Sequence, residues 1–325
     1  MRSPVLFLVF NRPDTTRRVF QAIRDARPPR LYIAADGARE AKQGERELCD
    51  EVRAIALQVD WPCEVHTLFR DTNLGCKNGV SSGVTWFFEH EPEGIILEDD
   101  VLPESTFFRF CDELLERFRN DVRVAAITGN NLIAHEFKIK DSYFFSRYPH
   151  IWGWASWRRA WNKYDVAMKN WPEWRDMGGL RKTWDGGRFL ESYWRHYFGS
   201  TFEGKIDTWD YQWFFACWYT GGLTIVPNTN QTRNLGYGAG ATHTTGDEPP
   251  AVRLSRARPL TFPLIHPATV ERSTKADSVI DAKVFGVNAL STLKRGIRSV
   301  PVFERYILFF KSLGRIFSSL RIKTG

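Results

Sequence analysis

The first 130 residues alternate between short runs of apolar residues and longer amphipathic segments. The apolar runs predict strands at 4–10, 30–37, 63–70, 94–97 and 124–129. The segments between them predict helices at 15–26, 44–58, 80–90 and 107–120, with Asp14 as the expected N-cap of the first helix. Continuous apolar strands that alternate with helices are typical of a parallel sheet covered on both faces. We therefore expect an α/β fold.

Polar side chains follow each predicted strand. They are Asn11-Arg12, Asp36, Arg70-Asp71, Glu98-Asp99-Asp100 and Asn130-Asn131. In parallel sheets ligands bind beyond the carboxyl ends of the strands, so these residues mark the expected binding edge. The first strand is not followed by GxGxxG, and GxxxxGK[ST] does not occur in the sequence. The standard dinucleotide and P-loop fingerprints are therefore not met.

Residues 141–245 differ in composition, because they are rich in Trp, Gly and Asn. Most of the 13 Trp of the chain fall between Trp152 and Trp218. Such a cluster either fills a core of large residues or stacks on sugar rings and bases. A helix is expected near 187–199, a strand at 222–227, and a Gly-containing loop at 229–244. A polar, Pro-rich stretch with little periodicity follows at 247–267.

The net charge of +7 lies in the last part of the chain. Residues 294–325 carry eight Lys/Arg and one acid, so residues 1–293 are neutral as a whole. A nucleic-acid-binding domain normally carries its basic patch within the fold, and we expect no nucleic-acid partner. Residues 301–322 are amphipathic at helical spacing, which predicts a basic helix on an anionic membrane surface. The alternative is a helix that docks on its own domain.

The five cysteines form no CxxC pair, and their number is odd. The apolar start is too short for a signal peptide or a membrane span. Both features favour reduced thiols in the cytoplasm, with the basic tail as a possible contact to the inner face of the cell membrane. The expected domain boundaries are 1–280 for the folded unit, divided at 135/136, and 281–325 for the tail.

The acidic triplet Glu98-Asp99-Asp100 is the strongest chemical signal of the sequence. Acids after a strand can simply begin a solvated loop or cap the next helix. They can also hold a hard cation such as Mn²⁺ or Mg²⁺, which takes carboxylate oxygens and keeps positions for phosphate. Such an ion would stabilise a leaving diphosphate.

Four segments together resemble a known family. PVLFLVFNRPD, IAADG, ILEDD and IWGWASW are similar to segments of GT-A glycosyltransferases of the N-acetylglucosaminyltransferase I type, and bacterial homologues share the opening FNRP. The resemblance covers residues 1–245. It implies a GT-A fold and metal-dependent, inverting transfer of a hexose or N-acetylhexosamine. A UDP-sugar is the expected donor, and a glycan or lipid-linked glycan the expected acceptor.

The resemblance also implies roles for the strand-end residues. Asp100 matches the acid that binds the metal, and Glu98 and Asp99 match acids that contact the sugar and ribose of the donor. Asp36 matches the acid that reads the nucleobase. The remaining donor-side positions are Asn11, Arg12 and Arg70.

The catalytic base of the family is an Asp after a Trp, which falls on Asp210 of TWDYQW. Tyr211 stands where the family has a second Asp, and Asp207 is the alternative base. Trp152, Trp154 and Trp209 fall on the acceptor side, although Trp152 and Trp154 could equally belong to the core. His243 matches a late histidine that ligates the metal in many GT-A enzymes, within a loop whose glycines suit a lid.

Two other functions share parts of this pattern. Sugar-nucleotide nucleotidyltransferases have a similar sheet, but they usually carry a Gly-rich signature after the first strand, and residues 4–14 contain no glycine. A non-catalytic domain that binds a glycan or acts as a scaffold is the other alternative. The intact acidic triplet and the Asp210 candidate weigh against it.

Overall fold

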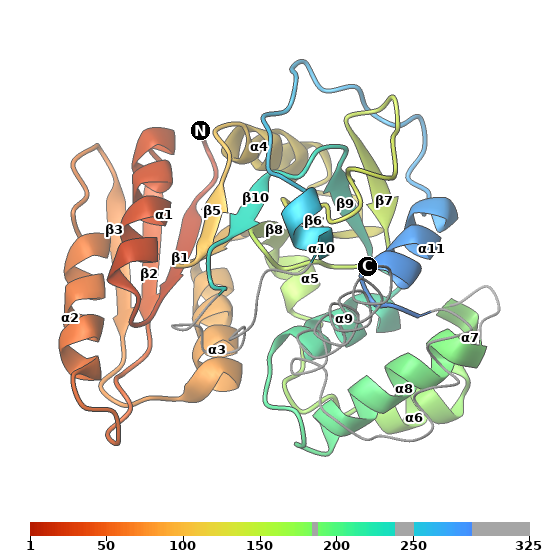
Figure 1. The fold of residues 1–325 in the computed structure, drawn as a ribbon, viewed down its shortest axis with the longest axis horizontal. Coiled ribbons are helices and arrows are strands. Elements are labelled where there is room, and N and C mark those ends of the chain that lie inside the picture. The colour runs from red at the N-terminus through yellow and green to blue at the C-terminus, as the bar shows by residue number, and fades with distance from the viewer. Residues whose placement is uncertain (184–187, 238–249, 288–325) are drawn as a thin grey trace, which may run out of the picture.

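The computed structural model describes residues 1–183, 188–237 and 250–287, which form a mixed α/β fold (Figure 1). Its main sheet has eight strands in the order β3-β2-β1-β4-β8-β6-β9-β7. They are β1 Val5–Val9, β2 Arg30–Ala35, β3 Glu64–Phe69, β4 Glu93–Glu98, β6 Val124–Thr128, β7 Tyr143–Ser146, β8 Trp154–Trp157 and β9 Leu223–Pro227. A second sheet pairs β5 (Val101–Pro103) with β10 (Thr232–Asn234). The predicted α/β class is confirmed.

The strands that were predicted from sequence pair in parallel within the main sheet. β3, β2, β1 and β4 are parallel to one another, and β6 is parallel to β9. The short aromatic strands β7 and β8 were not predicted, and both pair antiparallel. β8 lies between β4 and β6, so the fifth predicted strand is not a neighbour of the fourth.

Helices cover both faces of the sheet. The first part of the chain contains α1 Pro13–Ala26, α2 Glu45–Ala56, α3 Gly75–His90 and α4 Phe107–Arg117. The second part contains α5 Arg158–Trp161, α6 Trp171–Asp176, α7 Gly179–Thr183, α8 Arg188–Phe202, α9 Asp210–Tyr219, α10 Pro250–Leu254 and α11 Thr274–Lys283. Helices α6 to α8 gather beside α9 at the lower right of Figure 1.

Two predicted helix starts were wrong. Arg12, not Asp14, occupies the N-cap position of α1, because Pro13 takes the first helical position, where its missing N–H is not needed. Asp14 therefore lies in the first turn. Helix α3 begins at Gly75, earlier than the predicted residue 80, and a residue far away in the sequence caps it, as described below.

Side chains alternate strictly between the two faces of the central strands. In β1, Val5, Phe7 and Val9 pack with α1, α2 and α4, whereas Leu6 and Leu8 pack on the opposite face with α3. The same parity holds in β2 and β4: odd-numbered apolar residues join the first layer and even-numbered ones the second. This period of two is the ordinary geometry of a strand, and it decides which way each residue at the strand ends points.

The aromatic excess of the second part is mainly core. Among the largest fully buried side chains are Trp154, Trp157, Trp171, Trp194 and Trp213. The rings pack face to face or edge to face, as between Trp194 and Trp218, whose centroids lie 4.7 Å apart at 74°. Of the two explanations for the Trp cluster, the core therefore accounts for most of these residues.

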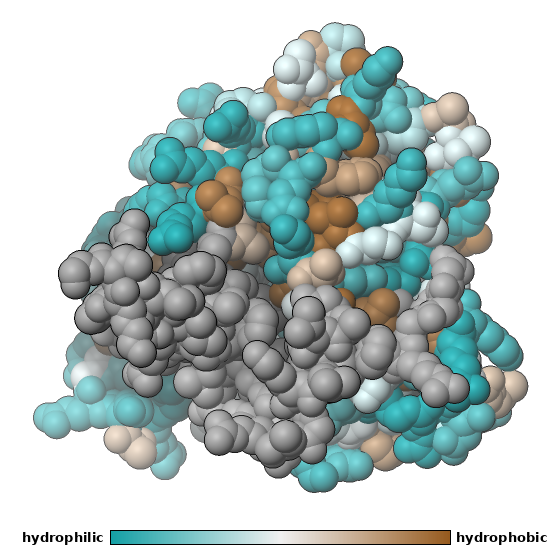
Figure 2. Space-filling model, turned by 45° about the vertical axis from the view of Figure 1, so that its right-hand side comes forward, coloured by the Kyte–Doolittle hydropathy of each residue, from teal (hydrophilic) through white to brown (hydrophobic). Residues whose placement is uncertain are grey.

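The surface in Figure 2 is largely hydrophilic, and hydrophobic residues show on it as separate patches. No helix within 1–183, 188–237 or 250–287 is long and apolar enough to cross a membrane. The predicted basic helix at 301–322 and the predicted metal ligand His243 lie outside the described residues.

Candidate functional site

A cavity of about 550 Å³ opens at the carboxyl ends of β1, β2 and β4. This is the edge at which the sequence places the binding site. Nine of the predicted site residues line it: Arg12, Asp36, Arg70, Glu98, Asp99, Asp100, Trp152, Trp209 and Asp210. Asp207, the alternative base, lines it too. The strand-end residues and the TWDYQW segment, which are more than 100 residues apart, thus share one cavity.

The pleat of β4 separates the three acids. Glu98 pairs in register with Leu8, so it follows the even-numbered residues toward α3. Asp99 turns toward β1, where its Oδ2 accepts a hydrogen bond from the Phe10 N–H at 2.9 Å. Asp100 forms an ion pair through Oδ2 with the guanidinium of Arg12, and the same Arg12 nitrogen lies 3.9 Å from Asp99 Oδ1.

Negative charge exceeds positive charge in this triplet. Burial raises the pKa of Glu98 well above its usual range, and the charges of Asp100 and Asp99 raise it further, while Arg12 lowers it. Burial likewise raises the pKa of Asp99 to about 7. The Glu98 carboxylate makes no side-chain hydrogen bond to the residues that the structure describes. Three acids thus share one guanidinium, an arrangement that is costly unless a cation joins it.

The donor set suits a hard divalent cation in part. Within the described residues, no three His, Cys, Asp or Glu side chains are grouped so that they could hold a metal on their own. Mg²⁺ and Mn²⁺ sites commonly use one or two carboxylates together with substrate phosphates and water. The oxygen ligands and surplus negative charge around Asp100 fit that kind of site.

Asp36 has a structural role that the sequence did not reveal. Its carboxylate accepts hydrogen bonds from the N–H groups of Leu74 at 2.9 Å and Gly75 at 3.1 Å, and from Asn73 Nδ2 at 3.1 Å. These donors belong to the start of α3, where backbone N–H groups have no partner within the helix. Asp36 therefore caps α3 and explains its early start at Gly75. The predicted contact with a nucleobase stays a prediction.

Asp210 is the first residue of α9 and is held in place from both sides. Its Oδ1 accepts hydrogen bonds from the Thr208 hydroxyl and from the Tyr211 N–H, the latter at 2.9 Å. Asp210 and Glu98 line the same cavity, and the charge of Asp210 helps to raise the pKa of Glu98. Asp207 is more exposed, at the same wall. The geometry brings both candidate bases to the cavity.

Cys76 is a site residue that the sequence analysis did not single out. Burial raises the pKa of its thiol, and Glu98, Asp210, Asp207 and Asp100 raise it further. One thiol on α3 therefore sits among carboxylates from β4 and from the approach to α9. The segment NLGCKNG carries no feature by which a sequence alone could place it there.

The three predicted acceptor tryptophans separate. Trp209 lines the cavity and is stacked on Trp154, with ring centroids 5.9 Å apart at 25°. Trp154 lies behind it, 1% exposed, and does not line the cavity. In this structure Trp154 supports Trp209 from behind, and its predicted contact with an acceptor stays a prediction. Trp152 lines the cavity beside Tyr237, at 6.2 Å between centroids.

Two other strand-end predictions do not reach the cavity. Asn11 Nδ2 donates to Glu45 Oε1 at 2.9 Å, so its side chain turns toward α2, and its expected contact with the donor stays a prediction. Asn131 is buried, and its Nδ2 donates to the Pro227 carbonyl at 2.6 Å. The insertion of β8 between β4 and β6 separates the end of β6 from the acids.

Gly236 closes tightly over Asp100. The Leu235 N–H donates to the Asp100 carbonyl at 2.6 Å, which holds the chain after β10 against β5. A Cβ added at Gly236 would lie 2.2 Å from Asp100 Oδ2, closer than real contacts allow. This segment lies within the predicted Gly-containing loop at 229–244, and its close packing on the acid was not predicted.

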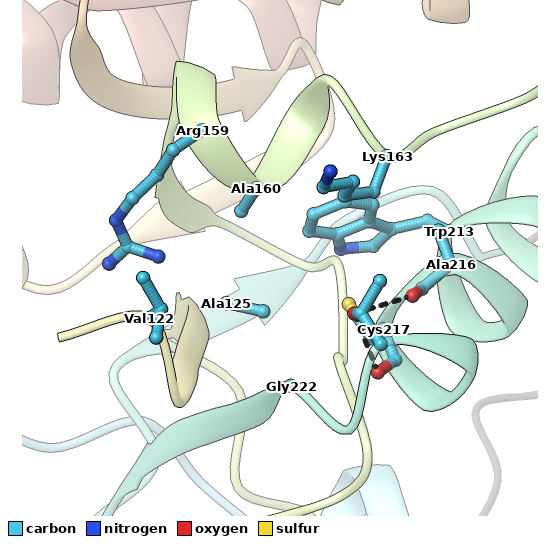
Figure 3. A pocket seen from close by; sticks show the side chains of 10 residues that line it. Val122, Ala125, Arg159, Ala160, Lys163, Trp213, Ala216, Cys217 and Gly222 are labelled. Carbon is cyan, nitrogen blue, oxygen red and sulfur yellow. Dashed lines mark hydrogen bonds between the residues drawn. The ribbon is translucent and has the colours of Figure 1, made fainter.

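A second, smaller cavity of about 260 Å³ lies at the other end of α9 (Figure 3). Its apolar lining includes Ala125, Ala160 and Trp213, with Arg159 and Lys163 at the side. No carboxylate lines it. Arg159 is engaged with the carbonyls of Arg119, Val124 and Phe118. The first cavity is therefore the candidate active site.

No protein-family model matches the sequence, and no curated protein was found as a relative. Among solved structures, residues 1–349 of TarS from S. aureus match with a TM-score of 0.34 and 6% identity, over 51% of this chain and 50% of that one. HddC from Yersinia pseudotuberculosis matches with a TM-score of 0.30 and 8% identity, over 50% of this chain and 80% of that one. A UDP-glucose pyrophosphorylase complexed with UDP-glucose matches with a TM-score of 0.31 and 7% identity, over 50% of this chain and 79% of that one. These matches cover about half of this chain.

Proposed function

We propose that this chain is a metal-dependent, inverting glycosyltransferase. It would move a hexose or N-acetylhexosamine from a nucleotide-diphosphate donor, such as a UDP-sugar, to a hydroxyl of a glycan or lipid-linked glycan. One observation carries the proposal: three adjacent acids, of which Asp99 is buried and Glu98 and Asp100 are partly exposed to the cavity, share that cavity with Asp210 and with the guanidinium of Arg12. The cavity volume of about 550 Å³ is within the range of sites for small molecules and cofactors.

Asp100 would hold the divalent cation together with the donor phosphates. When bound, the cation would act as a Lewis acid that stabilises negative charge on the leaving diphosphate. Glu98 and Asp99 would accept hydrogen bonds from hydroxyls of the donor. Arg70, whose Nη2 donates to Ser82 Oγ at 2.8 Å, would contribute positive charge on the donor side.

Asp210 would accept the proton of the attacking hydroxyl. Inversion needs one general base on the acceptor side, and Asp210 comes from the acceptor-side wall opposite the strand ends. Thr208 and the Tyr211 N–H fix Oδ1, which holds the carboxylate in one orientation. Trp209, backed by Trp154, gives a flat apolar wall beside it, a surface suited to one face of a sugar ring.

Labelled sugar nucleotides provide the test. The full chain is incubated with UDP-, GDP- and dTDP-sugars and candidate glycan acceptors, with Mn²⁺ or with EDTA. We expect label to enter the acceptor with Mn²⁺, and EDTA to abolish the transfer. Transfer that continues in EDTA would remove the metal from the proposal. Release of pyrophosphate from a nucleoside triphosphate would instead identify a nucleotidyltransferase.

The Asp210→Asn variant tests the base. We expect kcat to fall about 10²–10⁴-fold with little change in donor KM, because general-base catalysis contributes about that much. Asp207→Asn is the matched control, since it removes the same charge from the same cavity wall. A larger loss in Asp207→Asn than in Asp210→Asn would move the base to Asp207.

A further inference from the structure

We propose that Arg12 is a resident counter-ion of the acid triplet, and that a divalent cation reaches Asp100 only by displacing its guanidinium. The inference rests on the proposed function in one respect, because it takes Asp100 as the protein ligand of the metal. It concerns the state before substrate arrives. It assigns to Arg12 control over the metal, in addition to any contact with the donor.

The position of Arg12 follows from the end of β1. The strand ends at Val9 and α1 begins at Pro13, which leaves Arg12 as the N-cap residue, directly beside the end of β4. Its side chain is 21% exposed, and those of Asp99 and Asp100 are 8% and 14% exposed. An ion pair that is so shielded from water is weakly screened.

Arg12 remains charged despite its burial. Burial lowers the pKa of its guanidinium, but Asp100 and Asp99 raise it by more, so the net direction is upward. A guanidinium cannot lose its proton in a protein, so it leaves Asp100 only by moving. Among the described residues, Arg12 is thus the positive side chain that forms ion pairs with Asp99 and Asp100.

The backbone at Gly236 also restricts access to Asp100 Oδ2. Gly236 packs so closely against Asp100 Oδ2 that an added Cβ would lie 2.2 Å from it. Arg12 contacts the same oxygen. A cation bound to this carboxylate would therefore lie next to a guanidinium, and the two positive charges would repel strongly at such a distance.

A donor diphosphate offers the displaced guanidinium a new partner. Arg12 lines the same cavity, and the planar fork of its five N–H donors matches phosphate oxygens. The metal and the nucleotide should therefore bind cooperatively, with Mn²⁺ weak alone and tighter when UDP is present. By thermodynamic linkage, Mn²⁺ must raise the affinity for UDP by the same factor by which UDP raises the affinity for Mn²⁺.

Mn²⁺ binding to the full-length chain tests the inference without any transfer assay. Free Mn²⁺ is measured by electron paramagnetic resonance during titration of wild type, Arg12→Gln and Arg70→Gln. We expect Arg12→Gln to bind Mn²⁺ at least about tenfold more tightly than wild type in the absence of nucleotide, because a repulsive charge is gone. Arg70→Gln removes the same charge from the same cavity, but Arg70 itself hydrogen-bonds to Ser82. We therefore expect the Mn²⁺ affinity of this variant to change by less than about threefold.

Unchanged or weaker Mn²⁺ binding in Arg12→Gln would overturn the inference, because Arg12 would then orient Asp100 for the metal. An equal gain in Mn²⁺ affinity in Arg70→Gln would also overturn the inference, because the gain would then come from the overall charge of the cavity and not from Arg12. Arg12→Met also removes the charge, keeps an unbranched side chain and serves if Arg12→Gln does not fold. We expect its Mn²⁺ affinity to exceed that of wild type for the same reason, and wild-type affinity in this variant would count against the inference.

The outcomes for Arg12 and for the proposed function can be told apart. Tighter Mn²⁺ binding in Arg12→Gln, combined with no glycosyl transfer by wild type under any condition, supports the inference and rejects the function. Transfer that depends on Mn²⁺, combined with an unchanged Mn²⁺ affinity in Arg12→Gln, rejects the inference and supports the function. Saturating UDP should narrow the difference in Mn²⁺ affinity between wild type and Arg12→Gln. A wider difference would argue against displacement of the Arg12 guanidinium.

Discussion

Three acids at the end of β4 share one guanidinium, whereas two buried aspartates of α11 are matched by two arginines. Asp277, which is fully buried, accepts hydrogen bonds from Ser146 Oγ and Arg272 Nε, both at 2.5 Å. Asp281 accepts from Arg147 Nη2 at 2.9 Å, and Arg147 Nε lies 3.8 Å from Asp277. Among the described residues, two arginines thus face two aspartates in this α11 cluster, which connects β7 to α11.

The difference separates a structural cluster from a site. In the α11 cluster each carboxylate has its positive partner within the chain, so nothing further is required from outside. In the acid triplet, Glu98 makes no side-chain hydrogen bond to the described residues. Burial raises the pKa of Asp281 as it raises that of Glu98, but Asp281 accepts hydrogen bonds from Arg147 Nη2 and the Tyr148 hydroxyl. Buried acids alone would not distinguish the two. The balance of charge does, because uncompensated buried charge is costly and is retained where a ligand uses it.

The largest expected effect comes from breaking the balanced cluster. Arg147→Met should lower the free energy of unfolding by about 3–5 kcal/mol, because it leaves Asp277 and Asp281 buried with too little positive charge. Urea unfolding followed by circular dichroism measures the change. A loss below about 1 kcal/mol would mean that the α11 cluster tolerates unbalanced charge, and charge balance would then not explain its structural role.

The pH dependence of stability tests the unbalanced side. Burial raises the pKa of Asp99 in the folded chain to about 7, above the 3.8 of an exposed Asp, so the folded chain binds more protons than the unfolded chain between these values. Stability from this group is therefore fully present below about pH 4 and is lost as the pH rises to about 7, at no more than about 1.4 kcal/mol per pH unit. Urea unfolding at intervals from pH 5 to 7.5 without metal measures the slope. Asp99→Asn should flatten it, and an unaltered slope would contradict the assignment.

Neutralising one acid of the triplet should stabilise the metal-free chain. Glu98→Gln removes a buried charge next to Asp99 and Asp100, and we expect the free energy of unfolding at pH 8 to rise by about 1 kcal/mol. Glycosyl transfer should fall in the same variant. Asp277→Asn is the matched change in the α11 cluster and should destabilise, since it takes a partner from Arg147 and Arg272. The same sign in both variants would refute the comparison.

The smallest effect is expected at an exposed pair. Arg175 and Asp176 form an ion pair at 2.7 Å, with side chains 36% and 65% exposed. Arg175→Met should leave the urea midpoint within experimental error, because water and salt screen exposed pairs. This variant calibrates Arg147→Met, as it removes the same functional group from a pair that contributes little. A comparable loss in both would show that removal of arginine as such, and not burial, is responsible.

The strands around the acids could be predicted from sequence because each is a continuous apolar run. PVLFLVF, RLYIAA and GIIL stand between clear breaks, and their ends locate Arg12, Asp36 and the triplet at one edge. Strands β7 and β8 were missed because YFFS and WASW are short and aromatic within an aromatic region. Their pairing comes from contacts with strands far away in the sequence, which no local pattern carries.

Side-chain partners were the other limit of the sequence. Asn11 and Trp154 have the residue types and positions of site residues, yet one bonds to Glu45 and the other is buried behind Trp209. Asp36 caps α3 across 38 residues, as its bond to Leu74 shows. Strand parity could have told Glu98 from Asp99, but the pairing of Arg12 with Asp100 depends on how α1 leaves the sheet.

The alternation of side chains along β4 also limits how this protein can change over evolution. Insertion or deletion of one residue upstream of Glu98 would exchange the faces of every later side chain, since the strand repeats every two residues. The acid that now points toward α3 and Asp210 would then point toward β1, and its neighbour would take its place. Changes of two residues preserve the faces. Length variants of β4 in descendants of this sequence should therefore differ by even numbers.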